Sequence, residues 1–149
     1  MIRWFLLIGV VACLASPAQA QNASKVAEDI AQRWVTAYNS GDAKGVGALF
    51  TADGFWSPAT AELFKGPEAI ADTLATRIKL GFTKQTQKPT EAHQVGDVIW
   101  AAGEYDVFGS GENAGKHYAG RYGEVIVRDS TGNWHIAMLT GNGGMKPLH

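Results

Sequence analysis

The sequence has 149 residues, of which 46% are hydrophobic and 18% are charged. This length suits one domain rather than two, and the composition is that of a globular protein rather than a disordered one. The 13 basic and 14 acidic residues are interspersed and give a formal net charge of -1. No basic stripe is present, so nucleic acid is not an expected partner.

The N-terminal segment has the features of a secretory signal peptide. Arg3 gives a positive start, residues 4–14 form an apolar run, and Ala18-Gln19-Ala20 has small residues where signal peptidase cleaves. We therefore predict that residues 1–20 are removed and that the protein is exported, to the periplasm or the medium. A lipobox-like sequence ending at Cys13 offers a second route, in which a lipid anchors the protein.

Cysteine usage and histidine spacing exclude several kinds of site. Cys13 is the only cysteine, so the mature chain has no disulfide, thiol nucleophile or thiolate metal site. No pair of histidines, and no cluster of carboxylates with histidine, has the spacing typical of metal ligands. After the first few dozen residues, no apolar run reaches the roughly 20 residues that a membrane-spanning helix needs. We expect no metal, no cofactor and no membrane span.

Amphipathic periodicity predicts three helices in the first half of the chain. In the first helix, apolar residues recur at every fourth position from Val26 to Tyr38, with charged residues between them. Ser24 is the expected cap at its start. The third helix opens on Pro67, which suits a first helical turn. The expected helical spans are 24–41, 42–50 and 66–81, and the aromatic-rich segment 51–65 holds two short extended pieces.

From Phe82 onward the apolar residues alternate, which predicts a meander of four antiparallel strands. Gly96-Asp97 is a hairpin signal, and Pro89 marks an edge or a bulge in the strand before it. The expected strands are 83–95, 98–108, 116–129 and 134–140. We predict one domain over residues 21–142 and a flexible, glycine-rich tail over residues 143–149.

Helices packed on one face of a curved antiparallel sheet form an α+β architecture. A half-open cone of this kind leaves a pocket between the sheet and the first helix. Pockets in that position commonly bind small molecules.

Five segments, in this order and spacing, carry a family resemblance: residues 32–42, 48–53, 56–58, 64–70 and 132–136. Together they resemble the SnoaL-like and DUF4440 proteins of the nuclear transport factor 2-like superfamily, which includes the ketosteroid isomerases. The resemblance implies a cystatin-like cone, with three N-terminal helices on a curved antiparallel sheet. It also implies a homodimer built on the outer sheet face, where Trp100 and Phe108 would suit an interface.

The resemblance to ketosteroid isomerases does not extend to their reactive groups. A tyrosine on the first helix of those enzymes donates to the developing oxyanion, and Trp34 occupies that position here. Ser57, before Pro58, replaces the aspartate that shuttles the proton. Glu124 matches the second aspartate, which an apolar site keeps protonated. Steroid isomerisation is therefore not expected.

Glu124 is the candidate acid or base. It shares a strand face with Tyr118, Tyr122 and Ile126. If that face is the inner one, burial raises the pKa of the carboxyl and makes it a usable acid or base. A register slip of one residue would instead leave an exposed glutamate near Arg121. The sequence leaves both alternatives open.

Two functions fit these patterns. The first is binding of a small, mostly apolar organic molecule without catalysis, which predicts an exposed Glu124 and a cavity that is either apolar or filled by its own aromatic side chains. The second is a cofactor-free acid/base isomerase, cyclase or dehydratase, which predicts a carboxyl with a strongly shifted pKa in a cavity. The expected pocket residues are Trp34, Tyr38, Trp56, Ser57, His93 and Tyr122, with Glu124 as the catalytic candidate.

Overall fold

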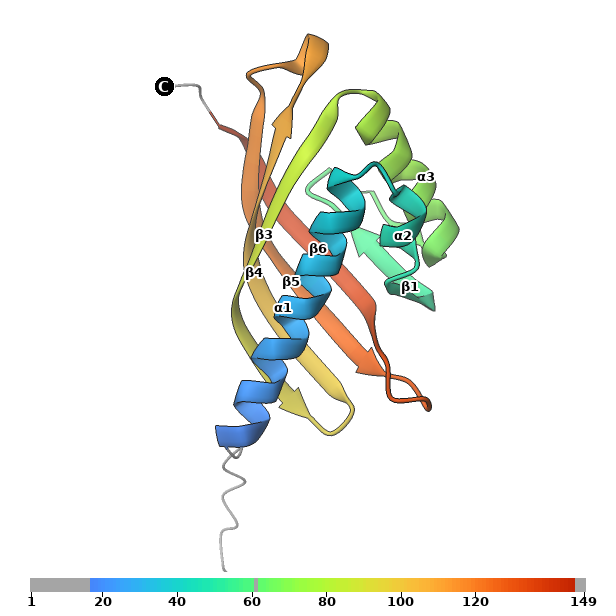
Figure 1. Cartoon of the computed structure of the whole chain (residues 1–149), viewed down its shortest axis with the longest axis vertical. Coiled ribbons are helices and arrows are strands. Elements are labelled where there is room, and N and C mark those ends of the chain that lie inside the picture. The colour runs from blue at the N-terminus through green and yellow to red at the C-terminus, as the bar shows by residue number, and fades with distance from the viewer. Residues whose placement is uncertain (1–16, 61, 147–149) are drawn as a thin grey trace, which may run out of the picture.

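A computed structural model of the chain describes residues 17–60 and 62–146. The predicted signal segment therefore lies mostly outside the described residues. The helices are α1 (Pro17–Asn39), α2 (Ala43–Gly47), α3 (Gly66–Lys79) and a single 3-10 turn, η1 (Gly111–Asn113) (Figure 1). The strands are β1 (Phe50–Ser57), β2 (Phe64–Lys65), β3 (Phe82–Val95), β4 (Val98–Gly109), β5 (His117–Arg128) and β6 (Trp134–Lys146).

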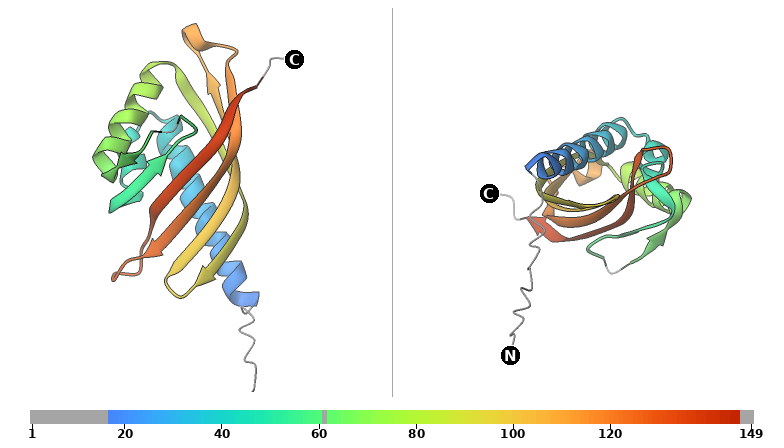
Figure 2. Two further views of the ribbon diagram at one scale, coloured as in Figure 1. Left: turned by 180° about the vertical axis from the view of Figure 1, so that it is seen from behind. Right: turned by 90° about the horizontal axis from the view of Figure 1, so that it is seen from below.

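The strands form one six-stranded sheet in the order β2-β1-β6-β5-β4-β3. Strands β3 to β6 make an antiparallel meander, and β1 joins the edge of β6 in parallel. The sheet is curved, and α1, α2 and α3 all lie on its inner side (Figure 2). This arrangement confirms the α+β cone, with one parallel pair in an otherwise antiparallel sheet. No helix in the described ranges is both long and apolar enough to cross a bilayer.

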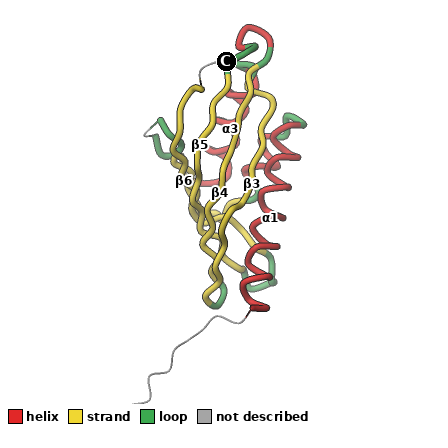
Figure 3. The backbone as a smooth tube through the Cα atoms, turned by 90° about the vertical axis from the view of Figure 1, so that its left-hand side faces the viewer, coloured by secondary structure: helices red, strands yellow, loops and turns green. Residues whose placement is uncertain are grey.

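Helix α1 runs beside β3 (Figure 3). It is fixed there by apolar packing and by a pair of hydrogen bonds to Asn39, the Asn39 clamp. Ile30, Trp34 and Tyr38 form a buried stripe toward the sheet, as their spacing predicts. At the end of the helix, the Asn39 side-chain amide donates to the Gln85 carbonyl at 3.0 Å. The Gln85 backbone N–H donates to the Asn39 side-chain oxygen at 2.7 Å. Together these contacts set the distance between α1 and the sheet.

The start of α1 differs from the prediction. The helix begins at Pro17, so Ser24 lies inside it and does not cap it. The reason is that Ala23 and Ala27 are fully buried and extend the apolar stripe toward the N-terminus. The sequence pattern was based on large apolar residues, so these two small residues were not counted as part of the stripe. Cleavage after Ala20 stays a prediction.

The glycine-rich end of the domain is strand rather than tail. The expected strand ended at residue 140, but β6 continues to Lys146 and pairs with β5 along its whole length, with Gly143 opposite Gly120 and Met145 opposite Tyr118. Pairing with a neighbouring strand compensates for the conformational freedom of the glycines. The expectation of a tail from residue 143 was therefore wrong as far as residue 146, and residues 147–149 lie outside the described part.

Candidate functional site

A cavity of about 350 Å³ lies between the helices and the inner face of the sheet. Its lining is dominated by seven aromatic side chains: Trp34, Tyr38, Trp56, Phe82, Tyr105, Tyr118 and Tyr122. Leu74 and Leu80 close it on the side of α3, and Leu139 and three glycines close it on the side of β6. Volume and lining are those of a site for a small organic ligand.

The two aromatic residues predicted on α1 line this cavity, but their polar atoms are engaged. The Trp34 indole N–H donates to the Gln85 side-chain oxygen at 2.9 Å, and the Tyr38 hydroxyl donates to the Phe82 carbonyl at 2.7 Å. Burial raises the pKa of Tyr38 to about 12. These residues therefore present ring surface to a ligand, while their hydrogen bonds hold α1 against β3.

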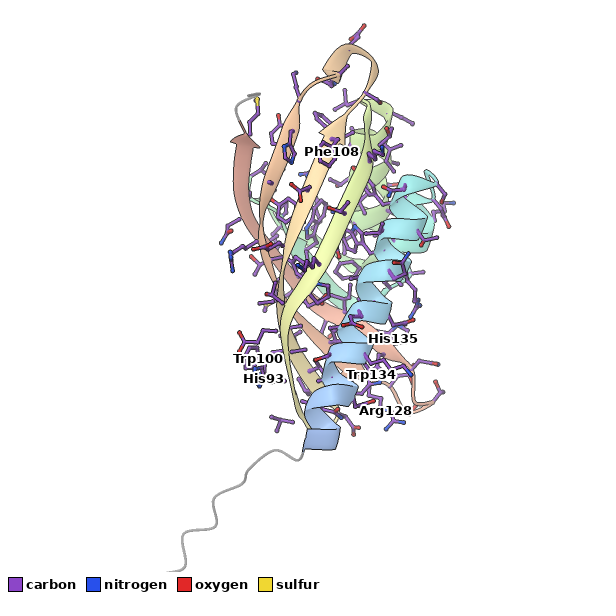
Figure 4. All side chains as sticks on the ribbon, turned by 60° about the vertical axis from the view of Figure 1, so that its left-hand side comes forward. His93, Trp100, Phe108, Arg128, Trp134 and His135 are labelled. Atoms are coloured by element: carbon purple, nitrogen blue, oxygen red, sulfur yellow. The ribbon has the colours of Figure 1, made fainter. Side chains whose placement is uncertain are left out.

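Two of the expected pocket residues lie elsewhere. Ser57 ends β1, where its hydroxyl donates to the Glu62 carbonyl at 3.1 Å, and it is absent from the cavity lining. His93 lies on the outer face, stacked on Trp100 with the ring centroids 4.1 Å apart (Figure 4). Its Nε2 also lies 2.8 Å from the Glu91 carboxylate. The prediction that Ser57 and His93 line the pocket was therefore wrong.

The position of His93 has a local cause. The ladder between β3 and β4 shifts register between Pro89 and Glu91, where a bulge adds one residue to β3. Before the bulge, Gln85 and Gln87 face the cavity. After it, the alternation is inverted, so His93 pairs with Trp100 on the outer face. The proline predicted the bulge, but the effect of the bulge on His93 was missed.

Glu124 faces inward, so the exposed Glu124 that binding without catalysis predicted was wrong. On β5 it lies opposite Ala101 of β4 and Leu139 of β6, and it is only 3% exposed. Burial raises the pKa of its carboxyl to about 8. Its Oε1 has no hydrogen-bond partner among the described residues. The inner register is fixed by Ile126, which is fully buried two positions further along the strand.

Tyr122 precedes Glu124 on the inner face of β5. It lines the cavity, whereas Glu124 occupies the next inward position of β5 and is absent from the lining. The Tyr122 hydroxyl is buried and, like Glu124 Oε1, has no partner among the described residues. Burial, and then the nearby Glu124, raise the pKa of Tyr122 above its usual range. Two polar atoms on the inner face of β5, the Tyr122 hydroxyl and Glu124 Oε1, are thus buried without a hydrogen-bond partner among the described residues.

Several lining residues were not predicted from the sequence, among them Gln85, Tyr105 and Tyr118, and the charged one among them is Arg77. It lines the cavity from α3, and its guanidinium lies 4.7 Å from the centroid of the Trp56 ring. The sequence does indicate this position for Arg77. It follows Ile70 by seven positions and Leu74 by three, so it shares their apolar helix face. No group of three or more metal-ligating side chains occurs in the described ranges.

Comparisons with known proteins agree with this architecture. A model of the SnoaL-like domain family matches residues 31–134. None of the curated proteins compared matches the chain significantly. A ketosteroid isomerase-like protein from Erwinia carotovora atroseptica is 20% identical, with a TM-score of 0.68 over 83% of this chain and 97% of that one.

Two further solved structures share the fold. An NTF2-like protein with a cystatin-like fold from Novosphingobium aromaticivorans is 20% identical, with a TM-score of 0.67 over 91% of this chain and 92% of that one. An NTF2-like superfamily protein from Salmonella enterica is 19% identical, with a TM-score of 0.65 over 83% of this chain and 94% of that one. At these identities the likeness concerns the fold, and function has to be argued from the site.

Proposed function

The chain belongs to the SnoaL-like domain family, and we propose that it binds a small, mostly apolar organic molecule in the cavity between its helices and sheet. The observation that carries this proposal is the cavity of about 350 Å³, which stays open although seven aromatic side chains surround it. Ring surfaces of this kind remove a flat apolar ligand from water, which supplies most of the affinity.

Gly141 on the inner sheet face supports the proposal, because it helps to keep the cavity hollow. It lines the cavity, and a Cβ there would contact the Tyr105 ring at 3.7 Å. A larger side chain at this position would occupy the space in which a ligand binds.

The proposal is tested with the neutral fluorescent probe N-phenyl-1-naphthylamine. We expect saturable binding at one site per chain in the micromolar range. Gly141→Val fills part of the cavity and should weaken binding at least tenfold. Gly123→Val is the matched control, since a Cβ there meets only Ala101 and Thr140 atoms at 4.0 Å and lies outside the lining. Absence of saturable binding, or equal losses in both variants, would refute the proposal.

A second candidate is a cofactor-free acid/base isomerase, cyclase or dehydratase that uses Glu124. It is favoured by the buried carboxyl with a pKa of about 8, because such a group is present in both protonation states near neutral pH. Proton abstraction next to a carbonyl would move a substrate C–H proton to the carboxylate and leave an enolate. Deuterium exchange of enolisable ketones in D₂O, followed by NMR, tests this. Exchange that Glu124→Gln leaves unchanged would exclude the enzyme.

We also propose a homodimer formed through the outer face of β3 and β4. On this face Trp100 is 46% exposed, and Val98 and Phe108 are also partly exposed, which is unusual for a solvated surface. Light scattering tests the proposal. Trp100→Lys should convert dimer to monomer, whereas Leu63→Lys, at an exposed residue between β1 and β2, should not. A wild-type monomer at high concentration would refute it.

Export stays part of the proposal. It is supported by the positive start, apolar run and small residues of the first 20 positions. The intact mass of protein recovered from a bacterial host distinguishes cleavage after Ala20 from lipid attachment at Cys13. An unprocessed N-terminus would overturn both routes.

A further inference from the structure

The cavity lining carries one charged side chain. Among the lining residues in the described ranges, Arg77 is the only arginine, lysine, aspartate or glutamate. Its guanidinium takes part in none of the salt bridges or hydrogen bonds that the described residues form. A guanidinium has five N–H donors and is always protonated, so the cavity contains a cation without a protein counter-ion.

The guanidinium lies over one aromatic ring of the cavity. Its Cζ is 4.7 Å from the centroid of the Trp56 ring, a cation–π contact that favours this position of the side chain. Its charge also acts on two tyrosines of the lining. Burial raises the pKa values of Tyr38 and Tyr105, and Arg77 opposes that rise in both. The positive charge therefore acts inside the cavity rather than in bulk solvent alone.

The nearest buried acid does not cancel this charge. Glu124 is absent from the cavity lining, and burial keeps its carboxyl largely protonated at neutral pH. The aromatic rings contribute no negative charge. The site as a whole therefore carries one positive charge at neutral pH.

We propose that the ligand of this cavity is a small organic anion with a flat apolar body, whose carboxylate or enolate oxygens are bound by Arg77. This inference rests on the proposed binding function and specifies its ligand class. A planar oxyanion with two oxygens matches the fork of a guanidinium and can accept two parallel hydrogen bonds. The apolar body then lies against the rings of Trp34, Tyr105 and Tyr122.

Desolvation explains why a neutral ligand fits less well. The Arg77 side chain is partly buried, and an apolar molecule that fills the cavity removes further water from its guanidinium, which is unfavourable for a charge without a partner. An anion replaces the lost water, because its oxygens accept charge-assisted hydrogen bonds from the guanidinium N–H groups. The cavity therefore discriminates between an acid and its neutral analogue of the same shape.

A matched pair of competitors tests this discrimination at pH 7. 2-Naphthoate and 2-naphthamide have nearly the same shape and differ in charge, and each is titrated against bound N-phenyl-1-naphthylamine. We expect naphthoate to compete at least tenfold better than naphthamide. Arg77→Met should abolish this preference while leaving the naphthamide affinity within about threefold. Arg77→Lys should retain part of it, because the charge remains and the planar fork is lost.

Lys79→Met is the control for charge. It removes one positive charge from an exposed position of the same helix and should leave the preference intact. Equal competition by naphthoate and naphthamide in the wild type would overturn the inference even if Arg77→Met does not fold. Equal losses for both competitors in a folded Arg77→Met would also overturn it. Failure of the neutral probe itself to bind would instead refute the underlying proposal of a ligand-binding cavity.

Discussion

The Tyr122 ring lies directly against the backbone of Gly103 on the neighbouring strand. A Cβ at residue 103 would come within 2.5 Å of the tyrosine ring and hydroxyl, so only glycine allows the ring this position. Glu124 is the next inward residue of β5 after Tyr122, and its charge acts on the Tyr122 hydroxyl. One glycine on β4 thus determines the position of a ring that lines the cavity.

Gly103→Ala is expected to displace the Tyr122 ring. Overpacking of this kind should lower the free energy of unfolding by about 1–3 kcal/mol, measured by urea denaturation. Gly144→Ala is the control, because nothing lies within 4 Å of a Cβ there, and we expect it to change stability by less than about 0.5 kcal/mol. Equal stability of Gly103→Ala and wild type would contradict the assigned position of Tyr122.

The burial of Glu124 predicts a particular pH dependence of stability. Its pKa rises from an ordinary 4.5 to about 8 in the folded protein, so between these values the folded chain holds a proton that the unfolded chain has released. The contribution to stability is full below pH 4.5 and decreases as pH rises to about 8. The free energy of unfolding should therefore fall by up to about 1.4 kcal/mol per pH unit relative to Glu124→Gln.

The measurement is urea denaturation of wild type and Glu124→Gln at intervals from pH 5 to pH 9. The difference between the two proteins isolates residue 124, because every other titrating group is common to both. A difference that stays constant across this range would show that the carboxyl titrates normally. In that case neither its burial nor its role as an acid or base could be maintained.

The Asn39 clamp predicts that the end of α1 depends on two hydrogen bonds. Asn39→Ala removes both and leaves the Gln85 backbone N–H without its acceptor, which should destabilise the protein by about 2 kcal/mol. Gln32→Ala, at an exposed position of the same helix where the side chain contacts Thr36, should change stability by less than about 0.5 kcal/mol. Thermal unfolding measures both. Equal shifts would indicate that the clamp contributes nothing.

Long periodic elements could be predicted from the sequence, because their burial follows directly from spacing. The stripe of Ile30, Trp34 and Tyr38 predicted α1, and alternation predicted the four long strands. The glycine-rich end of β6 could not be predicted in this way. Its residues have no apolar pattern, and its strand conformation comes from pairing with β5 and from the Tyr105 ring that lies across it.

The site could be predicted only in part, because the faces of Glu124 and His93 depend on strand register and because Arg77 is a charged residue on a buried helix face. The inner position of Glu124 depends on which face of β5 is buried, and its own strand pattern permitted both faces. His93 changed faces because of a bulge three residues earlier. Arg77 was overlooked because a charged residue on a helix is usually solvated, although its spacing from Leu74 places it on the buried side.

The most direct test of the ligand-binding cavity is to locate a bound probe by ¹H–¹³C NMR while N-phenyl-1-naphthylamine is added. We predict that the ring resonances of Tyr105, Tyr118 and Tyr122 and the methyl resonances of Leu139 shift in a saturable manner. The resonances of Val98 and Trp100 on the outer face should stay in place. Shifts confined to the outer face, with the cavity resonances unchanged, would contradict the account.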